Sequence, residues 1–304
     1  MKKKNPFLYR ISQFFGFLLG ARFFVATLLT FALYVSTFFL FAHEESLRSF
    51  VFDFKVHGII ACAVLSILAG GIINQFYDKE KDQITKPFRS RLQSFLKQKY
   101  FLYAYLVLVI LSLSLAFFIS PRVFIFFGIY QFLMWFYSHK LSKILLINNI
   151  SFVVLTLYPF FGMLVYYQTY SHKISLMALF LFLILVVLDI IKDVLTSAAD
   201  KVYNYNTIPT VLGERTANRI IKFLLVCLIV TAYFVADVWH FTGILAFYYL
   251  VCVPIFIASI VILTTSKERK YYITLNLLRL WIFVGILSML INGIDLRYQT
   301  FLPI

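Results

Sequence analysis

The chain has 304 residues, of which 62% are hydrophobic and 13% charged, and its mean hydropathy is +0.88. Soluble domains carry about 25% charged residues, so this composition excludes an ordinary soluble protein and indicates an all-α protein that crosses a membrane several times. The net charge of +15 does not indicate a nucleic-acid-binding protein, because the basic residues lie in loops between apolar stretches and not on a polar domain of their own.

The apolar stretches are long enough for helices of about 20 residues, and they lack the alternation expected of barrel strands. We predict a bundle of nine transmembrane helices over residues 20–293, preceded by a cytoplasmic segment at 1–19 and followed by a short tail at 294–304. The predicted spans are 20–42, 58–77, 100–119, 121–138, 147–167, 175–198, 217–237, 244–263 and 272–293.

The distribution of Lys and Arg over the loops predicts the orientation of this bundle. With a cytoplasmic N-terminus and nine spans, 21 of the basic residues fall in inside segments and 5 in outside segments. Because cytoplasmic loops carry an excess of Lys and Arg, we expect an integral protein of the inner or plasma membrane with its N-terminus in the cytoplasm. Both acidic stretches described below then lie at the cytoplasmic face.

The first acidic stretch begins where the second predicted span ends. Asn74, Asp78 and Asp82 are spaced i, i+4 and i+8, so on a helix they share one face over about two turns. Their side-chain oxygens suit a hard divalent cation such as Mg²⁺. Lys86 and Arg89 follow directly and suit the phosphate oxygens that such a cation would carry.

The second acidic stretch ends the sixth predicted span. Asp189 and Asp193 are one helical turn apart, and Asp200 returns to within about 20° of the same face. Lys192 lies beside this row. We interpret the two acidic rows as ligands for Mg²⁺ ions that bind a diphosphate and stabilise the charge that develops as it leaves.

These residues resemble the signatures of the UbiA superfamily of intramembrane prenyltransferases. Asn74-x-x-x-Asp78-x-x-x-Asp82 with Lys86-Pro87-x-Arg89 looks like the first signature, and Asp189-Ile-Ile-Lys192-Asp193 with Asp200 and Thr207-Ile-Pro-x-x-x-Gly213 is similar to the second. Tyr137-Ser-x-Lys140-Leu, with Asn149 after it, resembles the family's loop between the fourth and fifth helices. The resemblance covers about residues 20–290 in order and spacing.

The resemblance implies a nine-helix bundle that transfers a prenyl group from a prenyl diphosphate to a membrane-associated acceptor, with Mg²⁺ as cofactor and membrane lipids around it. It implies Asp78, Asp82 and Asp193 as catalytic residues. The implied metal ligands are Asn74, Asp78, Asp82, Asp189, Asp193 and Asp200, and the implied substrate-binding residues are Lys86, Arg89, Tyr137, Lys140 and Lys192.

The acceptor remains open between two classes. The form Ile-Ile-Lys-Asp with Thr-Ile-Pro more closely resembles members that prenylate glycerol-phosphate lipids, such as geranylgeranylglycerol-phosphate geranylgeranyltransferase, and an aromatic quinone precursor is the alternative. Gln75 and Thr196 depart from the family, since many members have an acidic residue at these positions. A catalytically impaired lipid-binding or transport protein is therefore a further alternative.

Overall fold

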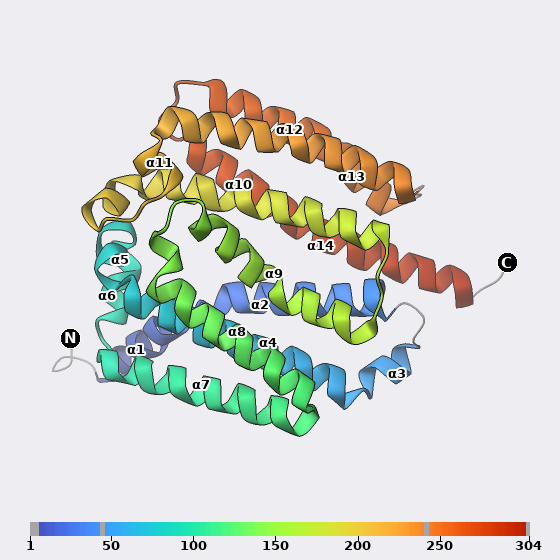
Figure 1. Cartoon of the computed structure of the whole chain (residues 1–304), viewed down its shortest axis with the longest axis horizontal. Coiled ribbons are helices and arrows are strands. Elements are labelled where there is room, and N and C mark those ends of the chain that lie inside the picture. Colours follow the sequence, from blue (N-terminus) through green and yellow to red (C-terminus); the bar gives the residue numbers. More distant parts are fainter. Residues whose placement is uncertain (1–5, 43–45, 240–242, 302–304) are drawn as a thin grey trace. The chain divides into compact units, whose positions relative to one another are not determined.

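The computed structural model describes residues 6–42, 46–239 and 243–301, and helices account for nearly all of their regular structure (Figure 1). The chain forms two compact units. The first comprises Met1–Tyr34 with Glu44–Ser142, and the second comprises Val35–His43 with Lys143–Ile304.

The first unit is built around α4. Asp53 begins this helix by accepting hydrogen bonds from the backbone N–H groups of Lys55 and Val56, at 2.9 and 3.2 Å. The helix then packs against α7 and α8. The helices of this unit are α1 (Pro6–Gly20), α2 (Phe23–Ser36, whose end passes into the second unit), α3 (Leu47–Val51), α4 (Phe54–Tyr77), α5 (Lys79–Thr85), α6 (Pro87–Gln93), α7 (Gln98–Ile119) and α8 (Pro121–His139).

Buried polar side chains join the three long helices of the first unit. The Gln131 Nε2 group of α8 donates to Ser66 Oγ of α4 at 2.8 Å, and the hydroxyls of Ser66 and Ser112 of α7 lie 3.1 Å apart. Hydrogen bonds of this kind hold transmembrane helices together where lipid offers no hydrophobic driving force. These hydrogen bonds fix the position of α4 relative to α7 and α8, and therefore the position of the acidic stretch at the end of α4.

The second unit contains the larger apolar core, in which α12 packs against both α10 and α13, as Figure 1 shows. Tyr248 stacks on Trp281 with ring centroids 5.0 Å apart, which joins α13 to α14. The helices of this unit are the π-helix η1 (Thr37–Phe41), α9 (Ile147–Tyr167), α10 (His172–Val202), α11 (Ile208–Val211), α12 (Glu214–Trp239), α13 (Ile244–Thr264) and α14 (Lys270–Phe301), with the 3₁₀ turn η2 (Leu141–Lys143) at the boundary between the units.

Each predicted span corresponds to one long helix, the first to α2 continued by η1. Eight of the described helices are long and apolar enough to cross a membrane. Among the helices that correspond to predicted spans, α8 is the one that does not meet this criterion. Arg122, Gln131 and the Trp and Tyr rings of α8 lower its mean hydropathy. Some helices extend beyond the predicted ends: α10 covers residues 172–202, and α14 continues to Phe301.

Candidate active site

The first acidic row lies at the junction of α4 and α5, in the first unit. The α-helix ends at Tyr77, and Asp78 both ends α4 and begins α5. The helical hydrogen bonds nevertheless continue, from Asp78 N to Asn74 O at 2.9 Å and from Asp82 N to Asp78 O at 2.8 Å. The three residues therefore stay one turn apart, and the Asn74 Nδ2 group donates to Asp78 Oδ2 at 2.7 Å.

Two basic side chains follow this row. Lys86 Nζ forms an ion pair with Asp82 Oδ1 at 2.7 Å, and Asp82 is only 4% exposed. Lys86 lies outside the helical region, with φ −139° and ψ 60°, as expected of a residue before a proline, and Pro87 begins α6. The Nε and Nη2 groups of Arg89 are buried and have no hydrogen-bond partner. A guanidinium held in this way is a donor available to an anionic ligand.

A third cation, Arg22, joins this cluster from the junction of α1 and α2. Burial lowers the pKa of Lys86 to about 8; the charge of Asp82 raises it, and those of Arg22 and Arg89 lower it. Burial and then the charge of Arg22 also lower the pKa of Arg89. Arg22 was not predicted from the sequence, because it lies 64 residues before Lys86 and only the packing of α1 against α6 brings the segments together.

Gln75 lies between Asn74 and Asp78 in the sequence but packs elsewhere. The side chain is 8% exposed, and a Cβ placed on Gly20 would collide with its carbonyl oxygen and come within 2.6 Å of the Phe101 ring. Gln75 is thus part of the contact between α1, α4 and α7. Its amide fills a packing position, while Asn74 and Asp78 pair with each other.

The end of α8 carries the two remaining predicted residues of the first unit. His139 packs edge-on against Tyr77, with ring centroids 5.4 Å apart, which places the ends of α8 and α4 side by side. Tyr137 is half-buried in the last turn of α8, and Lys140 is exposed directly after it. Both therefore lie at the same end of the first unit as the first acidic row.

The second acidic row lies on α10, in the second unit. Asp189 and Asp193 are 3% and 4% exposed, and Lys192 Nζ contacts Asp189 Oδ1 at 2.7 Å. The Asn149 Nδ2 group of α9 donates to both carboxylates at 2.8 Å, and Asn148 Nδ2 donates to Asp193 at 3.0 Å. Asn148 was not predicted from the sequence, and Asn149 was noted only for its place in a loop.

Asp200 follows Asp193 by seven residues on α10 and is fully buried. Its carboxylate accepts a hydrogen bond from the Thr196 hydroxyl at 2.8 Å. Thr196, the second departure from the family pattern, therefore orients an acidic residue instead of supplying one. The three predicted carboxylates of this row thus differ in their surroundings, with Asp189 and Asp193 joined through Asn149 and Asp200 held separately by Thr196.

The residues of both rows suit a hard cation by the chemistry of their donors. In the described part of the chain, no three His, Cys, Asp or Glu side chains come close enough together to hold a metal ion by themselves. Each row adds amide groups to its carboxylates, and the Oδ1 atoms of Asn148 and Asn149 are buried without a hydrogen-bond partner. Carboxylate and amide oxygens are ligands that Mg²⁺ accepts, so the donor set fits this ion.

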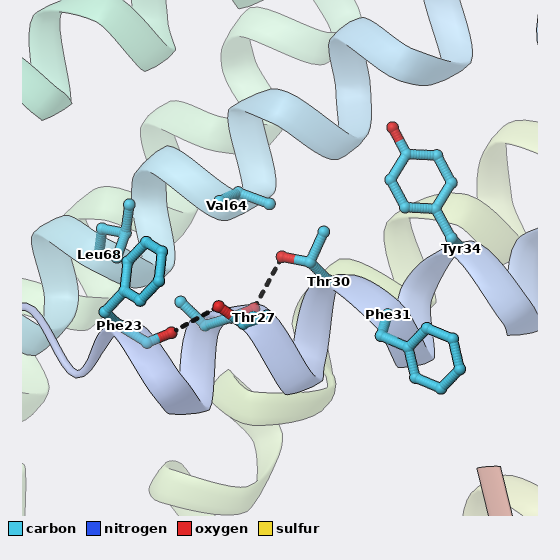
Figure 2. A pocket seen from close by; sticks show the side chains of 8 residues that line it. Phe23, Thr27, Thr30, Phe31, Tyr34, Val64 and Leu68 are labelled. Carbon is cyan, nitrogen blue, oxygen red and sulfur yellow. Dashed lines mark hydrogen bonds between the residues drawn. The ribbon is translucent and has the colours of Figure 1, made fainter. Parts of the chain in front are cut away.

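An apolar groove of about 410 Å³ lies in the first unit between α2 and α4. Figure 2 shows Phe23 and Tyr34 at its two ends, with Thr27 and Thr30 between them. Both threonine hydroxyls bond to backbone carbonyls of their own helix, at 3.0 and 2.7 Å, so the groove offers mainly hydrocarbon to a ligand. No sequence pattern marks this groove, because it results from how two apolar helices pack.

The sequence matches a family model described as the UbiA prenyltransferase family over residues 33–283. A curated relative from Thermococcus gammatolerans, named digeranylgeranylglyceryl phosphate synthase, is 28% identical over 236 residues, which is 76% of this chain and 83% of the relative.

Solved structures show the same fold. One, described as digeranylgeranylglyceryl phosphate synthase in membranes, has a TM-score of 0.70 at 18% identity and covers 93% of this chain and 99% of its own. Another, a UbiA homolog from Archaeoglobus fulgidus bound to GPP and Mg²⁺, has a TM-score of 0.62 at 15% identity and covers 90% and 99%.

Proposed function

The chain belongs to the UbiA prenyltransferase family, and we propose that it transfers a geranylgeranyl group from its diphosphate to a glycerol-phosphate lipid that already carries one. The observation that carries this proposal is the likeness to digeranylgeranylglyceryl phosphate synthases over three quarters of the chain. The form of the second acidic stretch supports the same acceptor class. An aromatic acceptor has no comparable support.

The reaction breaks the bond between C1 of the prenyl chain and the diphosphate oxygen. A hydroxyl oxygen of the glycerol lipid forms the new ether bond at C1, its proton is released, and diphosphate leaves with the bonding electron pair. The charge that must be stabilised therefore develops on the diphosphate oxygens. Fixed cations and hydrogen-bond donors aimed at those oxygens lower the barrier.

The residues proposed to hold Mg²⁺ are Asn74, Asp78 and Asp82 in the first row and Asp189, Asp193 and Asp200 in the second. Bound Mg²⁺ would offset the negative charge on the departing diphosphate. Lys86, Arg89, Lys140 and Lys192 are proposed to bind phosphate oxygens, and Tyr137 to contact the substrate. The buried N–H groups of Arg89 and the ion pairs of Lys86 and Lys192 support these roles.

We further propose that the N-terminus and the chemistry lie on the cytoplasmic side of the cell's inner or plasma membrane. The support is the distribution of 21 basic residues to the inside segments and 5 to the outside segments in this orientation.

The test uses purified protein in detergent with Mg²⁺, geranylgeranyl diphosphate and a panel of acceptors. We expect product from geranylgeranylglyceryl phosphate and none after removal of Mg²⁺ by a chelator. Asp78→Asn and Asp193→Asn should each reduce the rate by about 10²–10³, because each removes a charge that holds the cation at the leaving group.

The matched control is Glu80→Gln, since Glu80 is an exposed acidic residue of the same segment, two positions from Asp82. It should retain the wild-type rate. Product from 4-hydroxybenzoate instead of the glycerol lipid would replace the proposed acceptor. A wild-type protein that binds the prenyl diphosphate but releases no diphosphate would overturn the enzymatic proposal in favour of lipid binding.

A further inference from the structure

Two neighbouring asparagines begin α9 and face the second acidic row. Asn148 and Asn149 are 4% and 2% exposed, and both direct their NH₂ groups to carboxylates of α10. Asn149 bridges Asp189 and Asp193, with both distances at 2.8 Å. This amide therefore lies between two buried carboxylates that are one helical turn apart on α10.

The other half of each amide is left without a partner. The Oδ1 atoms of Asn148 and Asn149 are buried and accept no hydrogen bond. A buried acceptor without a partner is destabilising, and natural structures contain few of them. Gln75, Gln131 and Asn218 also have buried amide oxygens without a partner, but those of Asn148 and Asn149 are adjacent and lie beside two carboxylates. A cation bound at these carboxylates would give both oxygens a partner.

The backbone that places the two amides is strained as well. Leu146, immediately before α9, has φ 65° and ψ −39°, a conformation that a bulky side chain rarely adopts. Such residues are strained and gather at functional sites, where the surrounding structure holds them. The strain at Leu146 and the orphaned oxygens thus occur within four residues of one another.

We propose that Asn149, with Asn148, supplies oxygen ligands to the divalent cation of the second acidic row. An amide has a donor and an acceptor at nearly equivalent positions, so Asn149 can donate to Asp189 and Asp193 without a cation and offer its oxygen when one is present. This inference rests on the proposed function, because it takes the cation to be Mg²⁺. It adds two ligands from α9 to a set of proposed ligands that otherwise all lie on α10.

The test measures Mn²⁺ binding by electron paramagnetic resonance on the full chain in detergent, without prenyl diphosphate. An Asp78→Asn/Asp82→Asn background removes cation binding at the first row, so that the remaining Mn²⁺ reports on the second. We expect Asn149→Leu to weaken this binding by at least about 10–100-fold, which is the loss seen when a residue that only hydrogen-bonds to a metal ligand is removed. Asn149→Asp keeps an oxygen and should retain Mn²⁺ binding. Without metal, its melting temperature should be lower than that of the wild type, because the new carboxylate then lies beside those of Asp189 and Asp193.

Asn218 provides the matched control. It lies on α12 in the same unit, donates to the Leu263 carbonyl at 3.1 Å, and has a buried Oδ1 atom without a partner, but it contacts no carboxylate of the row. Asn218→Leu should lower the melting temperature and leave Mn²⁺ affinity unchanged. Wild-type affinity in Asn149→Leu, or equal losses in Asn149→Leu and Asn149→Asp, would overturn the proposal and leave the amides a purely structural role.

The result is separable from that of the proposed function. Mn²⁺ binding that depends on Asn149, in a protein that transfers no prenyl group, would support the ligand assignment and count against the transferase proposal. Prenyl transfer that persists in Asn149→Leu with unchanged Mn²⁺ affinity would support the transferase proposal and count against the ligand assignment.

Discussion

Arg22 illustrates how a single residue can complete a charge cluster that the sequence does not reveal. We expect Arg22→Gln to raise the KM for geranylgeranyl diphosphate by about 10–100-fold, because a charge-assisted hydrogen bond to phosphate contributes about 1.5–3 kcal/mol. Its charge already acts on Lys86 and Arg89, so the three cations exceed the two carboxylates, Asp78 and Asp82, beside them. Inhibition by inorganic diphosphate should weaken in parallel, which a steady-state assay measures.

Two variants separate charge from structure at this position. Arg22→Lys keeps the charge but lacks the planar fork, so it should recover part of the affinity. Arg10→Gln removes an exposed cation of α1 and should change nothing. If Arg22→Gln lowers kcat and thermal stability while KM and diphosphate inhibition stay at wild-type values, Arg22 supports the fold and does not bind phosphate.

The residues that sequence could predict are those whose chemistry follows a helical period. Asn74, Asp78 and Asp82 stand one turn apart in the sequence, and the backbone hydrogen bonds keep them so even where α4 ends. Asn148 carries no such signal, because its hydrogen bond to Asp193 depends on α9 facing α10. Gln75 shows a related limit: the sequence marks it only as a departure from a position that is often acidic, and the packing against Gly20 shows where its side chain lies.

At the scale of elements, α4 connects the apolar groove to the first acidic row. Leu68 lines the groove and precedes Asn74 by six residues, which is about 9 Å along the helix. Given the proposed function, we expect the groove to hold the prenyl chain. Val64→Trp should then fill the groove and raise the KM for geranylgeranyl diphosphate by about tenfold relative to farnesyl diphosphate, since the longer chain needs more of the volume.

Val107→Trp is the control for this prediction. Val107 lies on α7 in the same unit and is exposed, so the added ring meets no groove. The measurement compares kcat/KM for the two diphosphates in each variant. An unchanged preference for chain length in Val64→Trp would show that the prenyl chain lies elsewhere.

The helices themselves were predictable because long apolar stretches leave the backbone no other way to satisfy its hydrogen bonds in lipid. Their ends were less predictable. Arg22 has φ 51°, which separates α1 from α2 and moves the start of the first span from residue 20 to Phe23. The Ser120 cap and Pro121, in contrast, separate α7 from α8 at the position that the sequence predicts.

At the scale of the whole molecule, the proposed orientation assigns both acidic rows to one side of the membrane. Cysteines introduced at Lys201 and Lys267 should react with a membrane-impermeant maleimide only in inverted membrane vesicles. Cysteines introduced at Arg122 and Lys173 should react only in intact cells. All four positions are exposed in the structure. The physical reason is that short loops rich in Lys and Arg remain in the cytoplasm. The native cysteines that the structure buries, Cys62 and Cys252, should not react, and Cys227 is replaced by Ala for the assay.

The opposite labelling pattern would invert the orientation and move both rows to the outer face, where cytoplasmic prenyl diphosphate could not reach them. Labelling of Lys201→Cys and Lys267→Cys from different sides would contradict the nine-span arrangement itself, because α12 and α13 lie between these positions and an even number of crossings must return the chain to the same side. Reaction at Arg122→Cys tests α8 in particular, the helix whose hydropathy alone does not identify it as a span. If α8 does not cross, Arg122 and Lys143 lie on the same side, and Lys143→Cys should then react together with Arg122→Cys.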